Sequence, residues 1–161
     1  MRFTTIDSPV GPLRLVADDA GLRRLEFRQG REFASVPEEW TEDARALAPA
    51  ARQLKDYFEG RLKVFDLDLA PEGTEFQRRV WERLLEIPYG ETISYGTLAR
   101  RVGNANASRA VGLANGRNPI AIIIPCHRVI GSNGTLTGYG GGLPTKQKLL
   151  EMERGQIRLV C

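Results

Sequence analysis

The segment Pro71-Glu72-Gly73 constrains the fold most, because apolar residues follow different periods on its two sides. Before it, short runs such as Phe3–Asp7 and Leu13–Ala17 are separated by turn residues, which is typical of antiparallel strands. After it, apolar residues recur at helical spacing. A length of 161 residues allows one large or two small domains. We therefore predict an α+β protein with two domains, 1–72 and 73–161.

The first domain is predicted to be a small antiparallel sheet with one helix. Leu22–Phe27 supplies a third strand after the two named above. The helix is expected within residues 47–58, where apolar side chains recur at helical spacing, and Gly60 ends it. Apolar and acidic residues alternate over residues 65–69, which predicts a further strand with one wet face. No pattern in this domain indicates catalysis.

The second domain is predicted to be mostly helical. Thr74 and Gln77 have the spacing of a capping box and open a helix that stops near Pro88. Two shorter helices are expected at Ser94–Val102 and Ala107–Asn115, each followed by a glycine. Two short helices joined by a tight turn resemble a helix-turn-helix. The small side chains of the last helix permit close approach, either to a packed neighbour or to a narrow nucleic-acid groove.

Charge is distributed unevenly between the two halves. Residues 1–73 carry 11 basic and 14 acidic side chains, whereas residues 74–161 carry 12 basic and 6 acidic side chains. Between Thr92 and Gly142 there are five arginines and no acidic residue. A positive half of this kind is typical of a protein that binds a polyanion, although a solvated basic surface has the same composition.

The sequence lacks the features of a secreted or membrane protein. No stretch approaches the roughly 18 apolar residues of a membrane span, and charges and prolines interrupt the N-terminus where a signal peptide is apolar. Two cysteines, Cys126 and Cys161, are too few for a disulfide framework, and a single histidine argues against a structural zinc site. We expect a cytoplasmic protein with reduced thiols, no bound metal and no membrane partner.

Cys126 and His127 are the strongest candidates for chemistry. The apolar run Ile120–Ile124 is typical of a buried strand. Cys126, His127 and Arg128 follow at the end of this run. A cysteine beside such a run is more often an inert packing residue. A thiol with an ordinary pKa of about 8.5 is mostly protonated at neutral pH, so a nucleophilic cysteine needs a base or positive surroundings. His127 can supply the base, and Arg128 adds positive charge.

Four glycines and Tyr139 form the loop Gly138–Gly142. The run fits neither the dinucleotide nor the P-loop spacing, so we expect no nucleotide cofactor, and nothing else in the sequence calls for one. A loop that closes over a flat ligand and a plain connecting loop are both compatible with the pattern.

The residues Pro125–Val129 resemble the active-site signature of the O6-alkylguanine-DNA alkyltransferases, or methylated-DNA–protein-cysteine methyltransferases. The similarity covers about half of the chain, from Thr74 to Glu153, and includes Ile87–Thr92, Ser94–Gly96, Ser108–Gly112, Asn115–Pro119 and the glycine loop. The N-terminal half resembles the smaller, RNase H-like domain of that family. The resemblance implies a winged-helix-like second domain with a helix-turn-helix.

The resemblance also implies roles for catalytic residues. Cys126 accepts the alkyl group, and His127 is bridged to it by water and held by Glu153. Tyr95 donates to the purine ring and helps the guanine leave as a stabilised anion. Asn118 braces the turn between the recognition helix and the active-site strand.

A second group of residues is implied to contact DNA or the substrate base. Arg109 fills the gap left by an extruded nucleotide. Ala107, Ser108 and Gly112 lie against the minor groove. Backbone amides near Tyr139 and Gly140 contact O6 of the base. The carbonyls of Cys126 and Val129 contact its exocyclic amine. Gly140 stands where some members have serine, and the zinc ligands of some members are absent.

The implied function is DNA repair by direct, stoichiometric and irreversible transfer of an alkyl group to Cys126. The substrates are O6-alkylguanine and O4-alkylthymine in double-stranded DNA, and the protein is expected to be a monomer that can cooperate along DNA. Two other functions are compatible with the residues. A non-catalytic binder of alkylated DNA would not need Cys126, and a cysteine hydrolase with Cys126, His127 and Glu153 as a triad would turn over.

Overall fold

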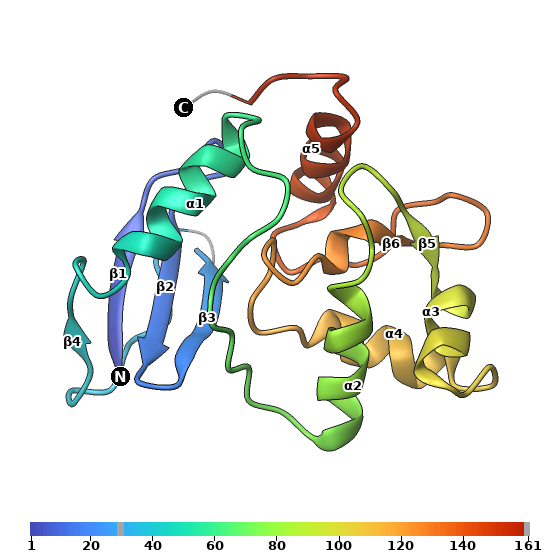
Figure 1. The fold of residues 1–161 in the computed structure, drawn as a ribbon, viewed down its shortest axis with the longest axis horizontal. Coiled ribbons are helices and arrows are strands. Elements are labelled where there is room, and N and C mark those ends of the chain that lie inside the picture. Colours follow the sequence, from blue (N-terminus) through green and yellow to red (C-terminus); the bar gives the residue numbers. More distant parts are fainter. Residues whose placement is uncertain (29–30, 160–161) are drawn as a thin grey trace. The chain divides into compact units, whose positions relative to one another are not determined.

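A computed structural model describes residues 1–28 and 31–159 of the chain, so Cys161 lies outside the described residues. The chain is a mixed α+β protein that forms two compact units (Figure 1). Met1–Pro71 and the segment from Arg158 form the first unit, and Glu72–Ile157 forms the second. Within the described part of the chain, no helix has the length and apolar character needed to cross a membrane.

The first unit contains a four-stranded sheet in the order β3-β2-β1-β4. Its strands are β1 (Arg2–Ile6), β2 (Leu13–Asp18), β3 (Gly21–Phe27) and β4 (Thr41–Glu42). The three long strands pair antiparallel, as predicted, but β4 pairs parallel with β1, so the sheet is mixed. Helix α1 (Ala48–Phe58) lies over the sheet in Figure 1 and buries an apolar face that includes Leu54 and Tyr57.

The predicted strand at residues 65–69 is wrong. The only pairing described there is an isolated bridge between Leu22 and Leu69. The side chain of Gln53 satisfies both backbone groups of Asp66, with its amide nitrogen 2.8 Å from the carbonyl oxygen and its amide oxygen 2.8 Å from the N–H. In this part of the described chain, backbone bonds to Leu22 of β3 are confined to Asp68 and Ala70, and a side chain satisfies Asp66, so no regular strand forms.

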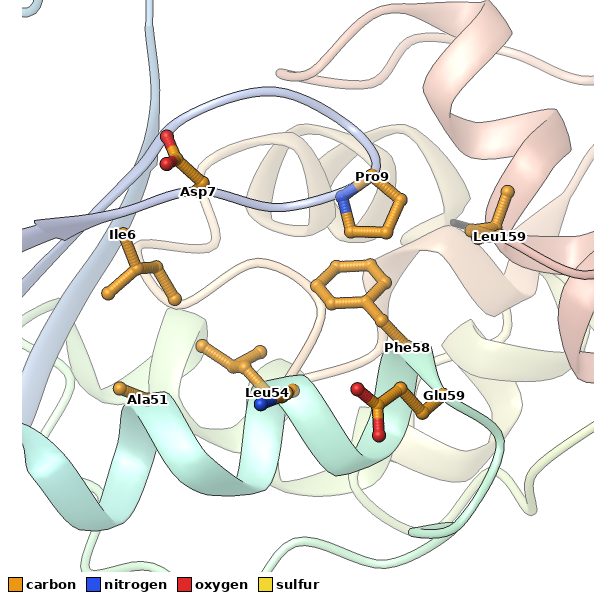
Figure 2. A pocket seen from close by; sticks show the side chains of 9 residues that line it. Ile6, Asp7, Pro9, Ala51, Leu54, Phe58, Glu59 and Leu159 are labelled. Carbon is orange, nitrogen blue, oxygen red and sulfur yellow. The ribbon is translucent and has the colours of Figure 1, made fainter. Parts of the chain in front are cut away.

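An apolar cavity of about 510 Å³ lies beside the C-terminal end of α1, within the first unit (Figure 2). Leu54 and Phe58 face Ile6 and Pro9 across it, and Leu159 closes one side. Among the described residues no histidine or cysteine lines the cavity, and Cys126 and His127 lie in the second unit.

The second unit is built from four helices and a two-stranded parallel sheet. The helices are α2 (Glu75–Leu84), α3 (Tyr95–Val102), α4 (Ser108–Gly116) and α5 (Leu143–Glu153), and the strands are β5 (Ile93–Ser94) and β6 (Val129–Ile130). Helices α2, α3 and α4 pack against one another. The indole N–H of Trp81 on α2 donates to the Ala114 carbonyl on α4 at 2.9 Å, which ties these two helices together inside the core.

Three of the predicted helix ends in this unit are confirmed by their caps, whereas the predicted glycine end of the last of these helices is wrong, because Gly116 is the last residue inside α4 and Arg117 is its C-cap. Thr74 and Gln77 form the reciprocal capping box at the start of α2. The Ser94 hydroxyl accepts from the Thr97 N–H at 3.1 Å and caps α3. Gly103 ends α3 with a φ of 99°, a left-handed conformation that glycine adopts without steric cost.

The predicted strand at Ile120–Ile124 is also wrong. The segment is a buried turn in which Ile122 has a φ of 73°, and the Ile124 N–H donates to the Ile120 carbonyl at 3.0 Å. The side chain of Asn118 closes the turn, because its amide nitrogen donates to the Ile124 carbonyl at 2.7 Å and its oxygen accepts from the Ile120 N–H at 3.0 Å. The residues of the run are apolar because the segment is buried in the core. The hydrogen bonds from Asn118 determine that its backbone forms a turn and not a strand.

Candidate active site

The thiol of Cys126 stands at the start of a single 3₁₀ turn, η1 (Cys126–Arg128), directly after the buried turn at residues 120–124. Only 6% of Cys126 is exposed. Its N–H donates to the Ile124 carbonyl at 2.8 Å, so the position of the thiol depends on the turn that Asn118 holds. The brace that the resemblance implies for Asn118 agrees with these bonds.

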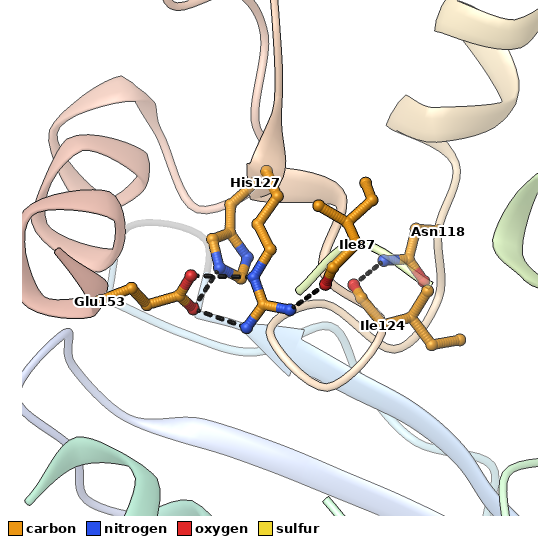
Figure 3. A network of polar contacts seen from close by, with 6 residues as sticks. Ile87, Asn118, Ile124, His127 and Glu153 are labelled. Carbon is orange, nitrogen blue, oxygen red and sulfur yellow. Dashed lines mark hydrogen bonds and ion pairs between the residues drawn. The ribbon is translucent and has the colours of Figure 1, made fainter. Parts of the chain in front are cut away.

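His127, Arg128 and Glu153 form a buried polar network (Figure 3). Nε2 of His127 lies 2.7 Å from Oε2 of Glu153 on α5. Arg128 donates to both carboxylate oxygens of Glu153, from Nε at 2.8 Å and from Nη2 at 3.0 Å, and its Nη1 donates to the Ile87 carbonyl at 2.7 Å. A bidentate guanidinium fixes the plane of a carboxylate, so the carboxylate in turn fixes the imidazole.

The charges of this network fix the proton on His127. Burial alone would raise the pKa of Glu153, but hydrogen bonds from His127 and Arg128 outweigh it and hold that pKa well below its ordinary range. An ionised carboxylate can only accept, so Nε2 of His127 carries the hydrogen. Nδ1 then has a free lone pair, and it is buried without a hydrogen-bond partner among the described residues.

The pKa shifts of the thiol and the imidazole both favour the neutral forms, so they oppose proton transfer between the two groups in the free protein. Burial raises the pKa of Cys126 above its ordinary value, although a hydrogen bond from Asn118 and the charge of Lys146 oppose this. Burial lowers the pKa of His127, against the opposing effect of Glu153. At neutral pH the thiol therefore holds its proton and the imidazole is neutral, so the imidazole can act as a base once a substrate arrives.

Lys146 is a buried residue of the site that sequence patterns missed. Its side chain is fully buried on α5, and Nζ donates to the Val129 carbonyl at 2.7 Å and to the Thr137 carbonyl at 2.8 Å. Its charge acts on Cys126 in the direction that favours the thiolate. Lysines are usually exposed, and the sequence signals nothing else at this position.

Tyr139 lies beside the imidazole in the glycine loop. Its ring meets the ring of His127 edge to face, with 6.4 Å between centroids and an interplanar angle of 82°. Burial, followed by the charges of Cys126 and Glu153, raises the pKa of Tyr139 well above its ordinary value, so the phenol stays neutral. The loop therefore carries an aromatic side chain to the buried thiol.

The residues expected to contact DNA or the base lie on several elements. Arg109 is exposed in the first turn of α4, and Ala107 and Ser108 at the start of that helix are half-buried. A Cβ added at Gly112 would lie 3.6 Å from the Tyr95 ring, an ordinary van der Waals contact, so the ring lies against α4 at this position. Gly140 is exposed and has open space around it.

The two carbonyls expected to face the exocyclic amine are both engaged in the structure. The Cys126 carbonyl accepts from the Val129 N–H and, at 3.5 Å, from the side-chain amide of Asn115, and the Val129 carbonyl accepts from Lys146. Because a carbonyl oxygen has two lone pairs, an exocyclic amine at Cys126 would have to displace the long bond from Asn115.

No three His, Cys, Asp or Glu side chains gather as a metal site would require within residues 1–28 and 31–159. The structure thus brings Cys126, His127, Glu153 and Asn118 into one buried constellation, and it adds Arg128 and Lys146. Such a constellation can deprotonate one thiol and stabilise the resulting anion.

Comparison with known proteins gives matches over nearly the whole chain. Residues 75–155 match the family model described as 6-O-methylguanine DNA methyltransferase, DNA binding domain, and residues 1–71 match the ribonuclease-like domain of the same methyltransferase. A methylated-DNA–protein-cysteine methyltransferase of Methanosarcina acetivorans is 56% identical over 153 residues, which are 95% of this chain and 98% of that relative. The Mycobacterium tuberculosis protein of the same name is 51% identical over 156 residues, which are 97% and 94% of the two chains.

Solved structures agree with the sequence matches. A crystal structure of Mycobacterium tuberculosis OGT in complex with DNA superposes with a TM-score of 0.89 at 51% identity, covering 98% of this chain and 96% of that chain. A crystal structure of the O6-methylguanine methyltransferase of the same organism gives a TM-score of 0.88 at 50% identity, covering 99% and 96%.

Proposed function

The chain belongs to the 6-O-methylguanine DNA methyltransferase family, and we propose that Cys126 is the residue that accepts the alkyl group from damaged DNA. The protein is a methylated-DNA–protein-cysteine methyltransferase that repairs DNA by direct alkyl transfer. One observation carries the assignment of the acceptor. Among the described residues Cys126 is the free, buried cysteine, and the next residue in the chain is a histidine whose protonation the Glu153 carboxylate fixes.

The first step is removal of the thiol proton. Nδ1 of His127 carries the free lone pair of the imidazole, so this atom takes the proton. A bridging water passes the proton from the thiol to Nδ1, as the family resemblance implies. The imidazolium that forms keeps its bond to Glu153, whose charge is held by Arg128. Lys146 and Asn118 stabilise the thiolate, because both act to lower the pKa of the thiol.

The second step is transfer of the alkyl group. The thiolate attacks the alkyl carbon in line with the bond to O6, so a carbon–sulfur bond forms as the carbon–oxygen bond breaks. The electron pair of the broken bond passes to the guanine. Tyr95 supports its departure by donating a hydrogen bond to the purine ring. No group near Cys126 can make the thioether carbon electrophilic again, so each molecule acts once.

DNA binding is assigned to the domain at residues 73–161, and the domain at residues 1–72 supports it. Arg100, Arg101, Arg109 and Arg117 are exposed on or beside α3 and α4, in a region without acidic side chains. These charges attract the phosphate backbone, and the small side chains at the start of α4 allow the helix to enter the minor groove. An O6-alkyl group is inaccessible inside a duplex, so the base is turned out of the stack and Arg109 fills its place.

The thiol chemistry also suggests where the protein works. A free Cys126 is the acceptor, and a reducing compartment keeps it as a thiol. We therefore place the protein in the cytoplasm, with access to DNA. O6-alkylguanine is the proposed main substrate, and O4-alkylthymine presents the same alkyl–oxygen bond.

The test is the intact mass of the protein after incubation with duplex DNA that contains O6-methylguanine. The mass should rise by one methylene, since a methyl group replaces the thiol hydrogen, and the increment should map to the peptide that contains Cys126. Unmodified protein together with unrepaired DNA would refute the assignment. Repeated repair without a modified peptide would instead indicate a hydrolase.

A further inference from the structure

We infer that Thr137 is a positioning residue for alkyl transfer, because its hydroxyl orients the Tyr95 hydroxyl toward the leaving guanine. The oxygen atoms of the two hydroxyls lie 2.7 Å apart. The inference rests on the proposed function, in which Tyr95 donates to the purine ring. Thr137 does not touch the substrate in this arrangement and acts through Tyr95.

The contact joins two segments that are 42 residues apart in sequence. Tyr95 is the first residue of α3, and its ring lies against α4 beside Gly112. Thr137 belongs to the loop that leads from β6 to α5. The hydrogen bond therefore connects the helix pair expected to bind DNA with the loop that carries Tyr139.

The position of Thr137 is fixed from the interior by Lys146. Nζ of this lysine donates to the Thr137 carbonyl at 2.8 Å and to the Val129 carbonyl at 2.7 Å, directly after η1. A buried ammonium that lost either carbonyl would keep an unsatisfied donor, so the two acceptors are held firmly. The backbone of Thr137 is anchored near Cys126, while its side chain reaches the Tyr95 hydroxyl.

The direction of the Tyr95–Thr137 hydrogen bond decides whether Tyr95 can act on a substrate. Each hydroxyl has one hydrogen and two lone pairs. When Tyr95 donates to Thr137, its hydrogen is unavailable to the purine. When Thr137 rotates and donates to Tyr95, the phenol hydrogen is free for a ring nitrogen of the guanine. Substrate binding therefore selects the second direction.

The proton balance of the transfer explains why this direction favours reaction. The thiol proton moves to His127, and the electron pair of the broken carbon–oxygen bond spreads into the purine ring. Tyr95 donates its hydrogen bond to a ring nitrogen, so the guanine leaves as a stabilised anion and the phenol oxygen gains negative charge. The hydroxyl of Thr137 donates to that oxygen, and a hydrogen bond to an oxygen that carries negative charge is stronger than one to a neutral oxygen. Solvent afterwards protonates the guanine anion and removes the proton from His127.

Stability of the free protein does not account for the contact. Both hydroxyls are accessible to solvent in the free protein, so water can replace either partner at little cost. A base bound over Tyr95 would exclude that water, and the Thr137 hydroxyl would then become the partner of the phenol oxygen. The contact should therefore matter to transfer and hardly to folding.

The experiment compares Thr137→Val with Thr137→Ser in single-turnover reactions on duplex DNA containing O6-methylguanine. At saturating DNA, Thr137→Val should transfer about tenfold more slowly, which corresponds to about 1.4 kcal/mol of lost transition-state stabilisation. Thr137→Ser keeps the hydroxyl and should restore the rate, and DNA affinity should be unchanged in both. The matched control is Thr135→Val in the same loop, where the hydroxyl bonds only locally to Asn133.

Two further measurements separate the inference from a structural effect. Alkylation of Cys126 by iodoacetamide needs the thiolate but no proton donor for a guanine, so Thr137→Val should leave its rate unchanged. In a Tyr95→Phe background, Thr137→Val should cause no additional loss, because the hydroxyl that it orients is gone.

Three results would overturn the inference. They are wild-type transfer by Thr137→Val, equal slowing in the Tyr95→Phe background, and slower iodoacetamide alkylation that matches the loss of transfer. Failure of the proposed function would look different, because the wild-type protein itself would not move the methyl group to Cys126.

Discussion

Replacing Glu153 by glutamine should destabilise the second unit by an amount that depends on pH. The substitution keeps the shape of the side chain and removes its charge. The buried guanidinium of Arg128 then loses the anion to which it donates at 2.8 and 3.0 Å. Removing one partner of a buried ion pair costs about 3–5 kcal/mol, so we expect the free energy of unfolding at neutral pH to fall by about that amount.

The assay is urea unfolding followed by tryptophan fluorescence. The chain has two tryptophans, and a Trp40→Phe background leaves Trp81, which is buried on α2 in the second unit. The linear dependence on urea then gives the stability of the unit that contains Glu153. Glu86→Gln is the matched control, because this carboxylate pairs with Arg83 in an exposed ion pair and should cost about 0–1 kcal/mol.

The pH dependence gives the sign of the effect. The pKa of Glu153 is lower in the folded protein than its ordinary value of 4.5. The resulting stability is fully present above pH 4.5 and is lost as the pH falls toward the folded pKa. The difference between wild type and Glu153→Gln should shrink by about 1.4 kcal/mol for each pH unit below 4.5 until the folded pKa is reached. A difference that stays constant over this range would refute a charge effect and indicate a steric one.

Four other outcomes are expected. Cys126→Ala should abolish transfer yet bind alkylated duplex with nearly wild-type affinity in fluorescence anisotropy, and lost binding by a folded variant would contradict the separation of chemistry from affinity. Arg109→Ala should slow transfer from duplex DNA far more than from free O6-benzylguanine, whereas equal slowing would remove its role in base extrusion. Lys146→Met should raise the thiol pKa in the pH profile of iodoacetamide alkylation, because the nearby positive charge is lost, and an unchanged profile would refute that role. Repair should stop at one alkyl group per protein molecule, and continued repair of excess damaged DNA would exclude the single-use mechanism.

Three helix termini of the second unit could be predicted from the sequence because their causes are local. A capping box at Thr74 and Gln77 needs two side chains three residues apart, and the structure confirms both bonds. Ser94 and Gly103 likewise act on backbone within one turn of their own positions. Each of these signals can be read within a few residues of the chain.

The two wrong strands show where local patterns fail. Alternation at residues 65–69 and the apolar run at 120–124 report burial correctly, but burial does not specify the partner of the backbone. A side-chain amide binds the backbone in both segments, from Gln53 at Asp66 in the first and from Asn118 at Ile120 and Ile124 in the second. No local pattern marks Gln53 as a backbone partner, and Asn118 entered the prediction through the family resemblance alone.

The adjacency of Cys126 and His127 predicts the site, but the geometry of the site depends on residues that lie far apart in the sequence. His127 is fixed by Glu153, 26 residues later, and Arg128 clamps the same carboxylate 25 residues away. Glu153 entered the prediction through the family resemblance alone, since a carboxylate near a helix end is an ordinary surface pattern.

Lys146 shows why such a site resists prediction from composition or periodicity. Its hydrophilic side chain would be assigned to solvent, yet it is fully buried and bonded to the carbonyls of Val129 and Thr137, which both follow Cys126 in the chain. The cost of burying an ammonium is offset only because two carbonyls from distant segments converge on it. Every residue has a backbone carbonyl, so no sequence pattern predicts which two carbonyls bind this lysine. The buried charge can therefore be identified only from the fold, in which β6, Thr137 and α5 lie together.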